Sequence, residues 1–110
     1  MPLIDFAEVR ILVPIQRALD ALGWKEVCRY SGYQLRGKCP IHMSTNPRSR
    51  SFAVHLRLNR WFCHGCKRRG DVLDLWQLMH GLRVAEAARE LCDLVGAAVP
   101  YHFGTEKRNG

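Results

Sequence analysis

The middle of this 110-residue sequence lacks acidic residues, because neither Asp nor Glu occurs between Val27 and Gly70. The same segment carries ten Lys or Arg residues, whereas the rest of the chain has seven basic and ten acidic residues. The formal net charge of +7 therefore originates entirely in the middle segment. A concentrated positive field attracts phosphate polymers, and such binding weakens steeply with salt. A merely solubilising surface is the alternative, although solubilising charge is usually mixed in sign.

The sequence also lacks any apolar run long enough to cross a membrane. A secretory signal is not expected, since Asp5, Glu8 and Arg10 interrupt the apolar stretch that it would need. Five cysteines cannot all pair within one chain. These absences predict a cytoplasmic protein in a reducing environment, where clustered cysteines bind metal more often than they form disulfides.

Two short motifs predict a metal site. Cys39 and His42 form a C-x2-H pair, and Cys63 and Cys66 form a C-x2-C pair after 20 intervening residues. A two-residue spacing lets a tight turn aim two side chains at one point, and three cysteines with one histidine are a standard closed zinc set. Four ligands leave no open position, so we expect one structural Zn²⁺ rather than a catalytic one. We expect Gly65 to supply the backbone freedom that the second turn needs.

Other cysteines and histidines fit the site less well. His64 could replace His42 on composition alone, but its adjacency to Cys63 makes it a poor chelating partner. Cys28 and Cys92 are interpreted as small core hydrophobes, because neither has a partner at the two-residue spacing.

Hydrophobic periodicity predicts the first helix and the strands. Residues 6–22 follow a helical pattern with a break near Pro14. Strand character follows over residues 27–33, and residues 44–51 form an apolar-free, exposed loop. Residues 52–58 alternate between apolar and other side chains, which predicts a half-buried strand, and a turn then leads into a second strand over residues 60–63.

Two helices are predicted after Gly70. Asp71 is suited to cap the first of them, with Asp74 at the third helical position. This helix runs to about residue 80, and a second one covers residues 84–95. We expect three parts: an N-terminal helical segment packing on the zinc unit (1–26), the zinc-binding domain (27–104) and a disordered tail (105–110).

The order of the motifs resembles a known family. The relevant runs are Cys39-Pro40-Ile41-His42, Ser51-Phe52-Ala53-Val54, Cys63-His64-Gly65-Cys66, Gly70-Asp71-Val72-Leu73-Asp74-Leu75 and Glu86-Ala87. Together they are similar to the N-terminal zinc-binding domain of bacterial and phage DnaG-type primases. The resemblance covers roughly residues 30–95. The chain departs from the family pattern at residues 46–50, where Asn-Pro-Arg-Ser-Arg replaces E-K-T-P, and in a longer interval between the two ligand pairs.

This resemblance implies an α+β fold, in which a zinc ribbon with a small antiparallel β-sheet is flanked by helices. It also implies contact with single-stranded DNA template, while the polymerising chemistry belongs to a separate acidic, metal-binding domain. The acidic residues of this chain are scattered and form no paired-carboxylate cluster. We therefore expect neither enzymatic activity from this chain alone nor a small-molecule substrate.

Candidate DNA contacts come from the basic segment, because single strands bind to sheets that present cations beside aromatic rings. They are Arg48, Arg50, His55, Arg57, Arg60, Trp61, Lys67, Arg68 and Arg69. For Trp61 a core position is an equal alternative.

Two functions follow from these expectations. The first is a zinc-dependent module of primase type that binds DNA, single-stranded in preference to duplex, and that originates from a phage or mobile element. The second is a zinc-stabilised adaptor that docks onto a recombinase, transposase, helicase or polymerase. Its surface would comprise Trp24, Trp76 and the C-terminal helix.

Overall fold

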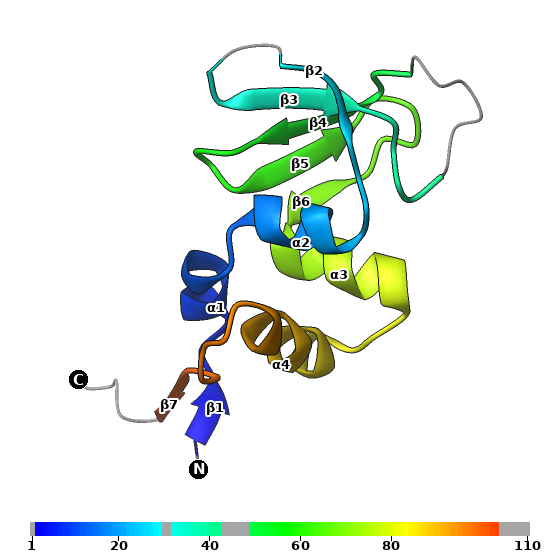
Figure 1. The fold of residues 1–110 in the computed structure, drawn as a ribbon. Helices are drawn as coiled ribbons and strands as arrows, with labels where there is room; N and C mark the ends of the chain where they lie inside the picture. The colour runs from blue at the N-terminus through cyan, green and yellow to red at the C-terminus, as the bar shows by residue number, and fades with distance from the viewer. Residues whose placement is uncertain (1, 30–31, 43–48, 104–110) are drawn as a thin grey trace.

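The computed structural model describes residues 2–29, 32–42 and 49–103. They form four helices, a five-stranded antiparallel sheet and a separate two-stranded sheet. The molecule is elongated, 50 × 28 × 26 Å, with the larger sheet at one end and the smaller sheet at the other (Figure 1). The predicted α+β class is confirmed.

The N-terminal segment contains a short strand and two helices, β1 (Pro2–Ile4), α1 (Phe6–Leu12) and α2 (Ile15–Ala21). The Asp5 carboxylate accepts a hydrogen bond from the backbone N–H of Glu8 and so caps α1. The helix ends before Pro14, whose ring is incompatible with a continuous helix, and the predicted break is confirmed.

The larger sheet has the order β2-β3-β4-β5-β6, and each neighbouring pair is antiparallel. Its strands are β2 (Glu26–Arg29), β3 (Gln34–Gly37), β4 (Phe52–His55), β5 (Arg60–Cys63) and β6 (Arg69–Asp71). The predicted strand over residues 52–58 is too long. It ends at His55 because the next four residues form the turn into β5, in which Asn59 adopts a left-handed φ of 59°.

The two faces of this sheet differ in chemistry. Leu35, Val54 and Trp61 lie opposite one another in register and are buried. The opposite face carries two cross-strand rows of half-buried or exposed positions. One row is Gln34, His55, Arg60 and Asp71, and the other is Arg36, Ala53, Phe62 and Arg69. We call this surface the open face.

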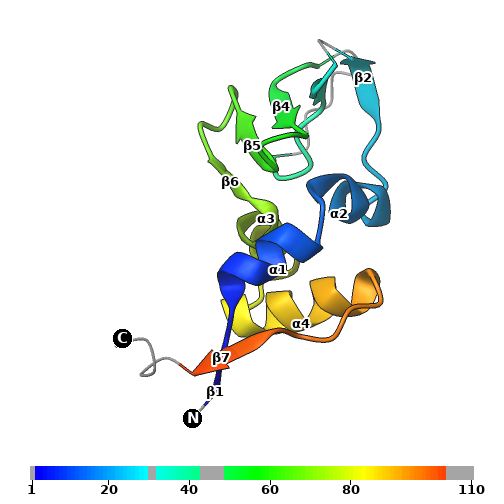
Figure 2. The ribbon, with the colours of Figure 1, turned by 90° about the vertical axis from the view of Figure 1, so that its left-hand side faces the viewer.

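The two C-terminal helices complete the core. Helix α3 (Val72–His80) begins at Asp71, whose carboxylate accepts hydrogen bonds from the N–H groups of Leu73 and Asp74. The Asp74 carboxylate in turn accepts from the N–H of Asp71, so the predicted reciprocal cap is confirmed. Helix α4 (Val84–Leu94) packs against α3 and α1, and α2 contacts both C-terminal helices (Figure 2).

The smaller sheet pairs β1 with β7 (Tyr101–Phe103), and its existence was not predicted. Three-residue strands give too short an alternation to stand out in a sequence, and this pairing spans nearly the whole chain. Among the described residues, no helix has the length and apolarity needed to cross a lipid bilayer.

Candidate metal centre

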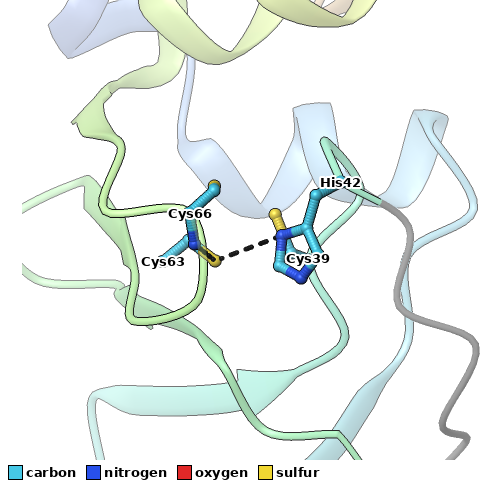
Figure 3. Close-up of side chains that lie close together, drawn as sticks. All are labelled: Cys39, His42, Cys63 and Cys66. Atoms are coloured by element: carbon cyan, nitrogen blue, oxygen red, sulfur yellow. Dashed lines mark hydrogen bonds between the residues drawn. The ribbon is translucent and has the colours of Figure 1, made fainter.

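The four predicted ligands meet at one end of the larger sheet. Cys39 and His42 follow β3, Cys63 ends β5, and Cys66 lies in the turn that leads to β6. One ligand atom from each residue lies within 4.8 Å of every other, and the side chains converge on a common point (Figure 3). Cys39 and Cys63 are buried, Cys66 is half-buried and His42 is exposed, so the cluster opens to solvent on the histidine side.

The distances and chemistry of the cluster fit zinc. The Sγ atom of Cys63 lies 3.6 Å from Nδ1 of His42. Zn–S bonds of about 2.3 Å and Zn–N bonds of about 2.0–2.1 Å in a tetrahedron separate the bound sulfur and nitrogen by about 3.6 Å. Backbone N–H groups support the sulfurs: that of Ile41 donates to Cys39 Sγ at 3.3 Å, and that of Cys66 donates to Cys63 Sγ at 3.4 Å. Such donors stabilise thiolate ligands.

The thiols have opposite acid–base tendencies. Burial raises the pKa of Cys39 to about 12. Burial acts in the same direction on Cys63, but hydrogen bonds from the backbone N–H of Cys66 and from neighbouring thiols outweigh it and lower the pKa of Cys63. Without a cation the Cys39 sulfur would therefore remain protonated at neutral pH. A bound metal requires the thiolate form, so metal binding must displace protons from this site.

Gly65 serves the site by leaving space, not by the backbone freedom expected of it. Its φ is not left-handed; the residue of this turn that adopts a positive φ is Lys67, at 64°. A Cβ atom on Gly65 would lie 2.9 Å from Cε1 and 3.2 Å from Nε2 of the His42 ring. The missing side chain thus allows the imidazole to approach the sulfur of Cys63.

Replacing Gly65 with alanine should therefore weaken zinc binding while leaving the fold intact when zinc is saturating. The added methyl group displaces the His42 ring, and we expect a loss of affinity of about 10–100-fold, comparable to that for lost supporting contacts at zinc sites. Competition with a chromophoric chelator measures this change. Gly32→Ala is the matched control, because a Cβ atom there meets nothing within 4 Å. Equal affinities of the two variants would contradict the steric role of Gly65.

The remaining cysteines and the competing histidine lie outside the cluster. His64 is exposed, and its ring packs edge-on against Phe62 with centroids 4.7 Å apart. Cys92 is buried, as predicted, but Cys28 is only half-buried. The core prediction for Cys28 fails because this residue is paired with Arg36 of the open face.

A five-stranded antiparallel sheet that brings a C-x2-H and a C-x2-C pair together defines the protein as a zinc ribbon with a closed, structural Zn²⁺ site. The family model of the DnaG zinc ribbon, described as the CHC2 zinc finger, matches residues 19–107. The chain belongs to this family.

Individual relatives agree with this assignment. The chain is 40% identical over 65 residues to the DNA primase of Thermotoga maritima, covering 59% of this chain and 11% of the relative. It is 27% identical over 85 residues to the DNA primase of Enterococcus faecalis, covering 77% of this chain and 13% of the relative. The crystal structure of the zinc-binding and RNA polymerase domains of Aquifex aeolicus primase superposes with a TM-score of 0.70 at 26% identity, covering 89% of this chain and 23% of that one. The chain thus spans about a tenth of the length of the curated relatives that it matches.

The predicted DNA contacts fall into three groups. His55, Arg60 and Arg69 lie together on the open face and line one shallow depression of about 480 Å³. Lys67 and Arg68 are exposed in the turn after the second ligand pair, and Arg50 is exposed just before β4. Arg57 belongs to the β4–β5 turn rather than to a strand, and its guanidinium lies over the Tyr33 ring, 5.2 Å from the centroid. Arg48 lies outside the described residues.

Of the two alternatives for Trp61, the structure has the core position and not the exposed DNA contact. Its side chain is only 3% exposed, stacks on Phe52 with centroids 5.5 Å apart, and donates to the backbone oxygen of Asp71. Phe62, the next residue along β5, points to the open face instead. The burial of Trp61 could have been predicted from the sequence. Trp61 is two positions from the buried ligand Cys63, and residues two apart on a strand lie on the same face of the sheet.

The two tryptophans of the alternative adaptor surface differ in burial. Trp76 is 7% exposed and donates to the Glu90 carboxylate. Trp24 is half-buried, packs edge-on against Phe52 and donates to the backbone oxygen of Lys38. Both indole N–H groups are therefore satisfied within the fold.

Proposed function

We propose that this chain is a primase-type module that binds single-stranded DNA on the open face of its sheet and does not polymerise nucleotides by itself. The observation that carries the proposal is the depression on that face, whose lining includes Arg60, Arg69, Phe62 and His55. Bases stack on aromatic rings and phosphates pair with cations, so this combination suits a single strand better than a duplex groove.

The aromatic surface continues beyond β4. Tyr33 is half exposed and its ring is nearly parallel to that of His55, with an interplanar angle of 11°. Arg57 covers the same tyrosine ring. The basic turn formed by Lys67 and Arg68 adjoins the open face at β6. A strand lying across the sheet would thus meet rings in its middle and cations on either side.

The proposed role is non-catalytic because the zinc has no open coordination position. Within the described residues, the zinc ligands are the only group of three or more metal-ligating side chains close enough to hold an ion. Nucleotide polymerisation would therefore require another domain. Three reduced cysteine ligands favour action in the cytoplasm. An origin in a phage or mobile element, and any replication or recombination partner, stay predictions.

Titration of fluorescently labelled oligothymidylate with the zinc-loaded chain at several salt concentrations tests this function. If Arg60, Lys67, Arg68 and Arg69 each neutralise one phosphate, the slope of log K against log salt should be about −3. The affinity should then fall roughly 50-fold between about 50 and 200 mM salt. A duplex of the same length should bind more weakly. The absence of binding at about 50 mM salt, or an affinity that does not respond to salt, would refute the proposal.

A further inference from the structure

The two most exposed large hydrophobic side chains among the described residues line the same groove. Ile11 of α1 is 74% exposed and Leu58 of the β4–β5 turn is 63% exposed. The groove has a volume of about 470 Å³, and Pro14 and Leu56 add further apolar surface to it. A single exposed leucine needs no explanation, but a shared apolar cleft rimmed by polar groups is typical of a binding surface.

The groove is held in shape by one asparagine. The Asn59 side chain accepts a hydrogen bond from the N–H of Ile15 at 2.7 Å. It donates to the backbone oxygens of Arg10 at 2.8 Å and of Val13 at 3.2 Å. These bonds join the β4–β5 turn to the break between α1 and α2, segments more than 40 residues apart. A binding surface that is ordered beforehand loses less entropy when it is occupied.

The rim of the groove is positively charged. Three arginines line it, Arg10, Arg57 and Arg60, against a single carboxylate, Asp71. Arg10 is paired with that carboxylate, whereas neither Arg57 nor Arg60 forms an ion pair within the described part of the chain. Arg57 lies over the Tyr33 ring, and a guanidinium in such a cation–π contact can still donate hydrogen bonds to a carboxylate.

From these observations we infer that the groove between α1 and the β4–β5 turn is a docking site for an acidic segment of a partner protein. An aliphatic side chain of that segment inserts between Ile11 and Leu58, and flanking carboxylates pair with Arg57 and Arg60. Nucleic acid fits this site less well, because no aromatic residue lines the groove for a base to stack on. A second copy of the chain fits poorly too, because it would set arginine rims of the same sign against each other.

Binding of the synthetic peptide acetyl-Asp-Asp-Ile-Leu-Asp-Asp-amide to the zinc-loaded chain, followed by NMR, tests the inference. We expect the largest chemical-shift changes at Ile11, Leu58 and Asn59. A peptide with glycines in place of the Ile-Leu pair should bind at least about tenfold more weakly. Absence of binding by the first peptide, equal binding of both peptides, or shift changes centred on Phe62 would each overturn the inference. Because the chemical-shift changes are measured on the unaltered chain, the position of the binding site is found without relying on the folding of a variant.

A pair of double variants adds a matched comparison. Ile11→Ser with Leu58→Ser should weaken peptide binding at least about tenfold, while Leu3→Ser with Leu78→Ser, two exposed leucines outside the groove, should leave it unchanged. The groove variant should keep its affinity for oligothymidylate, so failure of this inference is distinguishable from failure of the proposed DNA binding. If the groove variant instead weakened oligothymidylate and peptide binding equally, the groove would be part of the nucleic-acid surface and the inference would be wrong.

Discussion

Replacing Cys39 with serine should release the zinc ion and unfold the chain. Cys39 is 1% exposed and its sulfur converges with three other ligands that join the end of β5 to the segment after β3. Binding of a structural zinc is worth about 10–16 kcal/mol in small zinc domains. The net stability of a whole domain is only about 5–15 kcal/mol, so loss of the ion removes an amount comparable to the total.

Metal analysis and circular dichroism measure this prediction directly. The unaltered chain should contain one zinc per molecule and melt cooperatively, whereas Cys39→Ser should contain almost none and show no melting transition. Cys28→Ser is the matched control, because Cys28 is half-buried and lies outside the cluster. We expect this control to retain its zinc. A Cys39→Ser protein that kept both its metal and its melting temperature would show that the assigned ligand set is wrong.

The zinc site could be predicted from the sequence because its determinants are local. Each ligand pair is a two-residue spacing, which a single tight turn can realise without knowledge of the rest of the fold. The cap of α3 is local in the same way, since Asp71 and Asp74 belong to one helical turn. The break at Pro14 follows from the covalent structure of proline.

The features that escaped prediction depend on contacts between distant segments. The strand over residues 52–58 was predicted too long because its alternation continues through Leu58, whereas the turn is held by Asn59 bonding to the α1–α2 break. The position of Gly65 against the His42 ring requires the two ligand turns to face each other. Pairing of β1 with β7 likewise appears only once the helices have brought the chain ends together.

Reversing two charges on the open face should abolish DNA binding without loss of zinc. Arg60→Glu combined with Arg69→Glu changes the charge by −4 and places carboxylates on both sides of Phe62. Each lost phosphate contact lowers the affinity for DNA, and each introduced carboxylate repels the phosphate groups of the DNA. We expect at least about a 100-fold loss of affinity for oligothymidylate at low salt, measured by fluorescence anisotropy. Both side chains are exposed, so the melting temperature should change little.

A control variant distinguishes the effect of charges on the open face from the effect of the overall charge on DNA affinity. Arg83→Glu with Arg89→Glu changes the charge by the same −4, but both residues are exposed at or on α4, away from the sheet. If a general positive field attracted DNA, the two double variants would lose affinity equally. If the open face is the binding surface, the α4 variant should lose no more than about threefold, in line with screening of distant charges. A single Phe62→Ala variant distinguishes stacking from charge. Its loss of affinity should persist at high salt, because stacking on a ring does not depend on counterion release.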